Sequence, residues 1–154
     1  MYRSVNLALI LIALSGPAAA KPTGGGGSAP NPEIAYVSNS GKTSKLIVAN
    51  EDGTNASTLY SASFPLRFDL APRGQHQIAV SVGSTTDPAI FLLTYDVTGT
   101  GAFATTSTKR IASARRGSDV DFSPDGTELA FACCSNGQTE KLVVYDLTSG
   151  TTTP

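Results

Sequence analysis

The side chains that could perform chemistry in this chain are few. The 154 residues include one histidine, two cysteines and no tryptophan, so catalytic sites built from several His or Cys residues are excluded. His76 would have to serve as the base of a Ser-His-Asp hydrolase, and it is expected to be exposed beside a turn. No Gly-x-Ser-x-Gly motif is present to position a nucleophilic serine, and nothing singles out a carboxylate pair for glycoside hydrolysis. We therefore expect no catalytic residue and no enzymatic activity.

The densest group of carboxylates is Asp119, Asp121 and Asp125. Asp119 and Asp121 would share one face of a strand, where they could bind a hard cation together with Ser123. A calcium-binding loop does not fit, because Pro124 stands where such a loop needs glycine. We expect instead that these carboxylates cap turns and accept hydrogen bonds from backbone amides, and that the chain binds no metal.

A glycine-containing stretch at residues 99–104 imitates a dinucleotide-binding fingerprint. The residues after it, Thr105–Thr108, are β-branched and turn-like rather than helical. Without a helix N-terminus there is no amide cradle for a pyrophosphate. We therefore expect a hairpin loop at this position, and no cofactor.

Two adjacent cysteines, Cys133 and Cys134, follow a predicted strand. In a regular strand their sulfur atoms would point to opposite faces, which favours one buried and one exposed thiol over a bond between them. A vicinal or intermolecular disulfide is the alternative in an oxidising compartment.

The N-terminus predicts export. The first twenty residues carry Arg3, then an apolar stretch at 5–14, and end in three alanines before a predicted cleavage between Ala20 and Lys21. The apolar stretch is too short to span a bilayer core of roughly 30 Å, and no cysteine follows it for a lipid anchor. Residues 21–32 are rich in glycine and proline, which predicts a flexible linker. We expect a periplasmic or secreted protein without a stable membrane anchor.

Charge indicates which partners to expect. The net charge is −1 and only 15% of the residues are charged, which argues against a nucleic-acid-binding protein. One basic cluster, residues 109–116, is predicted to lie in a loop, where it could meet an acidic partner or a lipid headgroup, remain solvated, or pair with Asp119. Because aromatic and arginine side chains are favoured anchors, the candidate partner-binding residues are Phe64, Arg67, Arg115 and Arg116.

The remaining sequence predicts an all-β fold. Short apolar segments with a period of two are separated by turn signals such as Asp52-Gly53, Asp125-Gly126 and Asn136-Gly137. No stretch after residue 20 has sustained helical periodicity. The predicted strands are 34–37, 46–49, 67–70, 77–82, 90–95, 120–122, 129–132 and 142–145.

An internal repeat of about fifty residues lies in the range of propeller blades. The segment 69–80 is echoed by 121–131, DFSPDGTELAF, and a Tyr-Asp turn at 95–99 recurs at 145–150. Each repeat unit therefore contains a short strand, a Pro-x-Gly turn, two apolar strands and a short outer strand.

The segment 121–131 resembles the repeat of TolB-type β-propellers, which is related to the WD repeat, and 46–59 resembles the outer hairpin of the same blades. The unit around Pro72 departs from the pattern, because Arg73 stands where an acidic residue is usual. The resemblance implies antiparallel blades, a periplasmic location and an envelope protein or peptide as partner.

About three blade-like units fit the chain, at 33–64, 65–117 and 118–154, whereas closed propellers usually have four to eight blades. We expect an incomplete propeller, and self-association that completes the ring is one possibility. The predicted function is that of an exported, non-catalytic module that binds another protein. The alternative is the propeller fragment of a secreted, prolyl-oligopeptidase-like hydrolase whose catalytic domain is absent here.

Overall fold

The structure is a computed structural model, and it describes residues 33–72, 74–133 and 141–154. The regular secondary structure of these residues consists of β-strands only, which form three antiparallel sheets. The first sheet contains β1 (Glu33–Ser40), β2 (Thr43–Asn50) and β3 (Ser57–Ala62). The second contains β4 (Leu66–Leu70), β5 (Gln77–Val82), β6 (Ala89–Val97) and β7 (Phe103–Ser113), and the third contains β8 (Val120–Phe122), β9 (Glu128–Cys133), β10 (Lys141–Asp146) and β11 (Thr152–Thr153).

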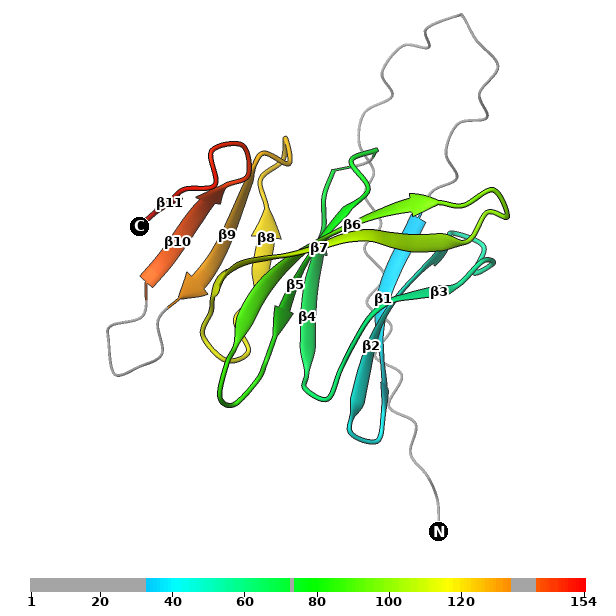
Figure 1. Ribbon diagram of the computed structural model, residues 1–154, viewed down its shortest axis with the longest axis horizontal. Coiled ribbons are helices and arrows are strands. Elements are labelled where there is room, and N and C mark those ends of the chain that lie inside the picture. Colours follow the sequence, from blue (N-terminus) through cyan, green and yellow to red (C-terminus); the bar gives the residue numbers. More distant parts are fainter. Residues whose placement is uncertain (1–32, 73, 134–140) are drawn as a thin grey trace, which may run out of the picture.

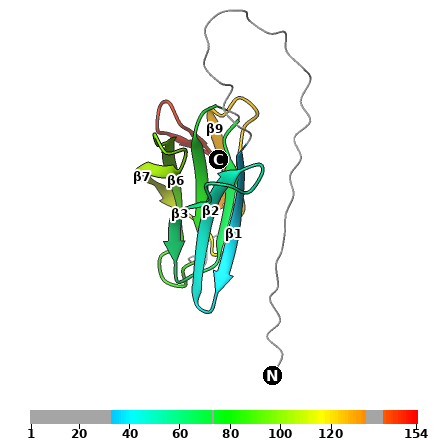
Figure 2. The same cartoon turned by 90° about the vertical axis from the view of Figure 1, so that its right-hand side faces the viewer.

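The three sheets lie side by side in chain order, like consecutive blades of a propeller. Figure 1 shows the first sheet on the right and the third on the left, and Figure 2 shows the same stack turned by 90°. Within each sheet, neighbouring strands in space are neighbours in sequence, so every connection is a hairpin turn or a short loop. The sheets of the described residues do not close into a ring.

Two hydrophobic clusters hold the sheets together, one at each interface. The first lies between the first and second sheets and includes Leu46, Ile78 and Leu93, which are fully buried. The second lies between the second and third sheets and includes Leu129 and Phe131. Alternate residues of the second sheet point into different clusters, as strand geometry requires. The middle sheet is therefore buried on both faces.

A tight turn between β8 and β9 shows why the Pro-Asp-Gly sequence is needed. The amide of Gly126 donates to the carbonyl of Ser123 at 2.8 Å, and Gly126 has a φ of +72°. The Asp125 carboxylate accepts from the amide of Thr127 at 3.1 Å and from the hydroxyl of Ser123 at 2.7 Å. The prediction that these carboxylates cap turns is therefore confirmed for Asp125.

The all-β, propeller-like prediction is confirmed, with three sheets in an open arrangement. Two local expectations were wrong. Residues 105–108 belong to strand β7 rather than to a turn, and Lys109 and Arg110 lie in the same strand rather than in a loop. The physical reason is that β7 is an outer strand whose polar side chains face solvent, so it lacks the apolar alternation that marks the inner strands.

Several predictions concern parts of the chain outside the described residues. These are the signal peptide with its cleavage between Ala20 and Lys21, the linker at 21–32, and the positions of Arg73 and Cys134. Within the described ranges, no helix is long and apolar enough to cross a membrane.

Asp69 links two neighbouring sheets through a hydrogen bond. Its carboxylate, on β4 of the second sheet, accepts from the amide of Phe122 on β8 of the third sheet at 2.7 Å. Asp69 is half-buried, and this burial raises the pKa of its carboxyl above the usual 3.8, although the hydrogen bond acts in the opposite direction. This hydrogen bond therefore joins the second and third sheets, and it holds the Asp69 carboxylate partly out of water, where its charged form is disfavoured.

We expect Asp69→Ala to lower the free energy of unfolding by about 1–3 kcal/mol, because the amide of Phe122 loses its partner. Asp69→Asn keeps an acceptor and should be milder. Because the raised pKa means that the native state favours the protonated form, the stability of wild type relative to Asp69→Asn should fall as the pH rises from 3.8 through the higher native pKa. Urea titrations of the three proteins across this pH range test the prediction, and a pH-independent difference between wild type and Asp69→Asn would contradict it.

Candidate partner-binding surface

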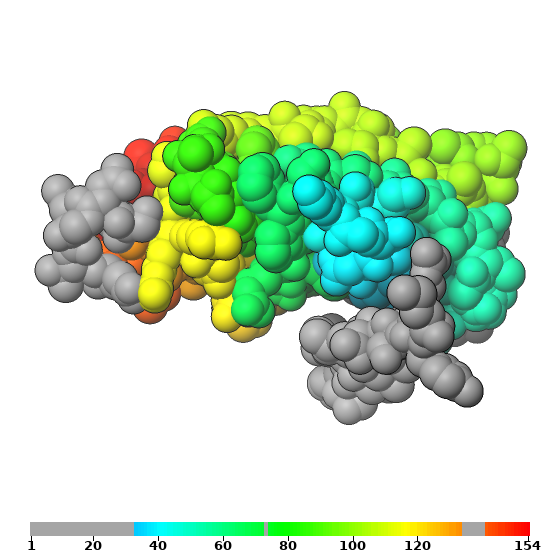
Figure 3. All heavy atoms as spheres, turned by 90° about the horizontal axis from the view of Figure 1, so that it is seen from below, coloured from blue at the N-terminus to red at the C-terminus, as the bar shows by residue number. Residues whose placement is uncertain are grey.

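Consecutive hairpin turns of an antiparallel sheet alternate between its two ends. The β1–β2, β3–β4, β5–β6 and β7–β8 connections therefore gather at one end of the stack, the lower end in Figure 1 and the face seen in Figure 3. The β3–β4, β5–β6 and β7–β8 connections are in direct contact: the amide of Gly83 donates to the carbonyl of Pro65 at 2.9 Å, and a Cβ on Gly83 would lie 3.8 Å from the amide nitrogen of Gly117. Three connections that are far apart in sequence thus form one surface.

The four predicted partner-binding residues all belong to this surface. Phe64 lies in the β3–β4 connection with 36% of its surface exposed, and Arg67 is the second residue of β4. Arg115 and Arg116 lie in the β7–β8 connection, where the amide of Arg115 donates to the carbonyl of Ala132 at 3.1 Å. The fold therefore brings together residues that are about fifty positions apart in the chain.

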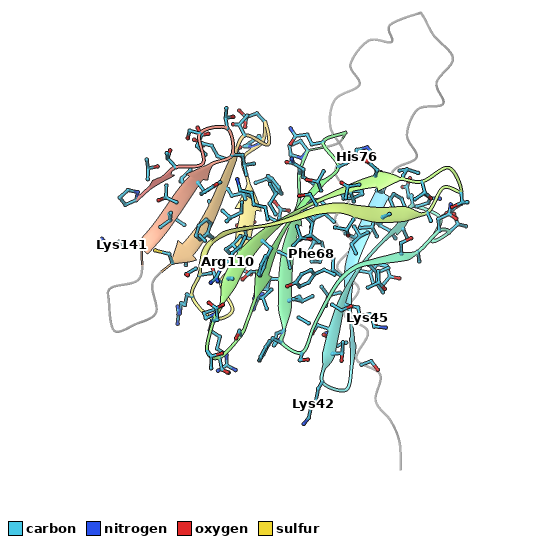
Figure 4. The ribbon with its side chains drawn as sticks, viewed as in Figure 1. Lys42, Lys45, Phe68, His76, Arg110 and Lys141 are labelled. Atoms are coloured by element: carbon cyan, nitrogen blue, oxygen red, sulfur yellow. The ribbon has the colours of Figure 1, made fainter. Side chains whose placement is uncertain are left out.

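Charge is segregated between the two ends of the molecule. Of the eight lysines and arginines among the described residues, seven belong to these turns or to the adjoining halves of the strands, and Lys141 is the first residue of β10; Figure 4 labels four of the eight. They are Lys42, Lys45, Arg67, Lys109, Arg110, Arg115, Arg116 and Lys141. We call this the basic end.

Carboxylates gather at the opposite end, in or beside the β2–β3, β6–β7, β8–β9 and β10–β11 turns. They are Glu33, Glu51, Asp52, Asp96, Asp125, Glu128 and Asp146, and we call this the acidic end. Several are held ionised by their turns. Hydrogen bonds from Thr54 lower the pKa of Asp52, and amides of Ser149 and Thr148 lower the pKa of Asp146.

Only part of the positive charge at the basic end is neutralised within the molecule. Arg67 pairs with Asp119 at 3.0 Å, and Arg110 forms a two-pronged pair with Asp87 at 2.6 and 3.1 Å. Among the described residues, no carboxylate forms an ion pair with Lys42 or Arg116, nor with the other lysines of this end. The basic end therefore presents cations to solvent, and its β3–β4 connection carries the partly exposed Phe64.

The three carboxylates that the sequence singled out as a possible cation site have different roles in the structure. Asp119 pairs with Arg67, Asp125 caps its own turn, and Asp121 is exposed on β8. Within the described ranges, no group of three or more His, Cys, Asp or Glu residues is arranged to hold a metal ion. The residues at 99–104 form the β6–β7 turn and the start of β7, where the amide of Thr98 donates to the carbonyl of Ala102 at 2.7 Å.

His76 lies in a different environment from the one expected. It was predicted to be exposed, but it is half-buried, and its ring packs against Tyr95 with 5.4 Å between ring centroids. Its Nδ1 atom is buried without a hydrogen-bond partner among the described residues. Tyr95 in turn donates its hydroxyl to Glu33, and burial raises its pKa. The His76 side chain therefore contributes to packing against Tyr95 near the acidic end.

Cys133 is disulfide-bonded, so the expectation that favoured free thiols is wrong at this position. Cys133 is the last residue of strand β9. The alternative that the sequence left open, a disulfide, is therefore the one found. The chain's other cysteine, Cys134, lies outside the described residues.

Comparison with solved structures relates this arrangement to a known protein. The crystal structure of TolB from Acinetobacter baumannii superposes with a TM-score of 0.60 and 26% sequence identity, over 79% of this chain and 29% of the TolB chain. The fold is TolB-like. The chain spans less than a third of the length of that TolB structure. No protein-family model and no curated protein sequence matches the chain.

The basic end was only partly foreseeable from the sequence. Two of its cations, Arg115 and Arg116, stand out as a cluster, whereas Lys42 and Lys141 are isolated in sequence. The alternation of turns could have found them. Successive strand connections lie at opposite ends of the sheets, and assigning each charged residue to the nearest connection places the cations at one end and most of the carboxylates at the other.

Proposed function

We propose that this chain is an exported, non-catalytic, TolB-like module that binds an acidic segment of another envelope or secreted protein through its basic end. The observation that carries the proposal is the convergence of Phe64, Arg67, Arg115 and Arg116 on one surface, together with the segregation of charge between the basic end and the acidic end.

The chemistry of the basic end favours an acidic protein segment. Unpaired cations attract carboxylates over about 8 Å at physiological salt and so accelerate encounter and set orientation. An exposed aromatic ring beside them supplies apolar contact area of the kind that anchors protein interfaces. Arg67 and Arg110 are already held in place by Asp119 and Asp87, so a partner meets a partly ordered surface.

A role in binding rather than catalysis is supported by the placement of His76. Its ring is packed against Tyr95 near the acidic end, and it lies in a different part of the stack from the converging turns. Connections carried on stacked sheets form a surface whose shape is fixed by the two cores, which suits recognition. Export rests on the N-terminal sequence pattern.

Site-specific photocrosslinking in the cells that naturally produce the chain tests the proposal. We expect benzoylphenylalanine in place of Phe64 to crosslink to a protein with an Asp- and Glu-rich segment. The same probe in place of Thr100, an exposed residue at the acidic end, serves as the control and should give no such product. Adducts that form at Thr100 and not at Phe64 would contradict the proposal, as would the absence of a protein adduct at both positions.

A further inference from the structure

The first and third sheets each have an outer face that belongs to neither hydrophobic cluster. On the third sheet, this face carries two directly opposed pairs, Ala130 with Val144 and Ala132 with Leu142. Leu142 is 69% exposed, the highest exposure among the large hydrophobic side chains of the described residues. We call this the forward face, because it points away from the preceding sheets.

The forward face repeats, in the same register, a face that is buried twice within the molecule. In the first sheet, the pairs Ala35–Val48 and Val37–Leu46 face the second sheet. In the second sheet, the pairs Ala79–Leu92 and Ser81–Ile90 face the third sheet. In each sheet an alanine of one strand lies opposite a branched aliphatic residue of the next strand: Ala35 opposite Val48, Ala79 opposite Leu92, and Ala130 opposite Val144. The forward face is thus a half-interface of the kind seen at both internal contacts.

The outer face of the first sheet is the complementary half. It carries the pairs Ile34–Ala49 and Tyr36–Ile47, which also belong to neither cluster. Ile34, Tyr36 and Ile47 are partly exposed there, whereas Ala49 is 1% exposed. In the second and third sheets, the pairs at the same positions pack on the sheet that precedes them in the chain. These are Ile78–Leu93 and Val80–Phe91 in the second sheet, and Leu129–Tyr145 and Phe131–Val143 in the third. We call this outer face of the first sheet the back face.

We propose that a second copy of this chain docks head to tail, with its back face on the forward face of the first copy. At both internal contacts, large residues of one sheet pack against small residues on the facing side of the preceding sheet; Phe131 and Ala79, for example, lie in the same cluster. Ile34 and Tyr36 of one copy are equally placed to pack against Ala130 and Ala132 of another. One molecule carries both halves of this contact.

The number of described sheets suits closure of such a contact into a pair. A head-to-tail contact uses two different surfaces, and it forms a ring if the rotation closes and an open filament if it does not. Two copies with three sheets each fall within the four to eight blades of closed propellers. Because every blade would keep the same orientation, the ring would carry one basic and one acidic rim. The pairing uses sheet faces rather than turns, so it does not depend on the proposed function.

Light scattering coupled to size-exclusion chromatography tests the pairing on protein purified after expression of the complete 154-residue sequence. Wild type is expected at twice the monomer mass at micromolar concentration. Leu142→Lys on the forward face and Ile47→Lys on the back face should each weaken the pair by about 100-fold, because each places an unpaired charge in an apolar contact. Val97→Lys replaces another exposed hydrophobic residue, which lies beside the β6–β7 turn and outside both faces, and should leave the mass unchanged.

Mixing the two variants distinguishes this arrangement from any other pairing. Leu142→Lys keeps an intact back face and Ile47→Lys keeps an intact forward face, so the mixture should form a pair joined by one contact. Circular dichroism of each variant confirms that it is folded; if Ile47→Lys is not, Tyr36→Ser takes its place on the same face. A monomeric wild type would overturn the proposal, as would assembly that survives Leu142→Lys or a mixture that stays monomeric.

Discussion

Replacing Phe131 by alanine should lower the free energy of unfolding by about 3–5 kcal/mol, the range for truncating a buried aromatic side chain. Phe131 is 2% exposed and lies in the centre of β9, between Val120 on β8 and Val143 on β10. Its ring fills the cluster between the second and third sheets. Truncation leaves a cavity at the contact that joins the third sheet to the rest of the molecule, and strands on both sides of β9 limit its collapse.

Urea unfolding followed by far-ultraviolet circular dichroism measures this loss, at one fixed protein concentration so that any association affects all variants alike. Val97→Ala is the matched control. Val97 is 46% exposed, and its truncation should change the free energy of unfolding by no more than about 0.5 kcal/mol. A loss below about 1 kcal/mol for Phe131→Ala would mean that the third sheet does not pack on the second as described.

Reversing two charges at the basic end should weaken partner binding by about 100-fold at low salt. The variant Lys42→Glu/Arg116→Glu changes exposed side chains that form no ion pair with described residues, so the fold should be unaffected. Each substitution replaces an attraction with a repulsion against an acidic segment. Added salt should narrow the difference from wild type, because exposed charges are screened beyond about 10 Å at 0.1 M.

The measurement is the dissociation constant for the protein captured at Phe64, determined by calorimetry at two salt concentrations. Glu51→Lys/Asp96→Lys, a reversal of the same size at the acidic end, is the control. If the net charge of the chain controlled binding, this control would strengthen it; we expect it to have little effect. Equal affinity of wild type and Lys42→Glu/Arg116→Glu would exclude the basic end as the contact surface.

The inner strands of each sheet could be predicted from the sequence because one or both of their faces are buried. Segments 77–82 and 129–132 are largely apolar, and both lie in strands whose side chains fill the two clusters. The outer strands β3, β7 and β11 were not located. β7 is polar along most of its length, because its side chains face solvent and it is held by backbone pairing to β6.

Features that depend on contacts between sheets could not be predicted from the sequence either. The pairing of Arg67 with Asp119 joins residues 52 positions apart, and no local pattern links them. His76 looked exposed because it follows a Pro-x-Gly turn, yet its ring is covered by Tyr95 from β6. By contrast, the capping role of Asp125 depends only on Ser123 and Thr127 beside it, and local sequence was sufficient.

Amide hydrogen exchange of the chain, alone and in complex with the captured protein, tests most directly the claim that partners dock on the basic end. We predict slower exchange in the bound state at residues 63–67, 83–88 and 114–119, the three connections that meet around Pro65, Gly83 and Gly117. The acidic-end turns at 51–56 and 98–102 should exchange at unchanged rates. Protection confined to those acidic-end turns, with the three basic-end connections unaffected, would contradict the account.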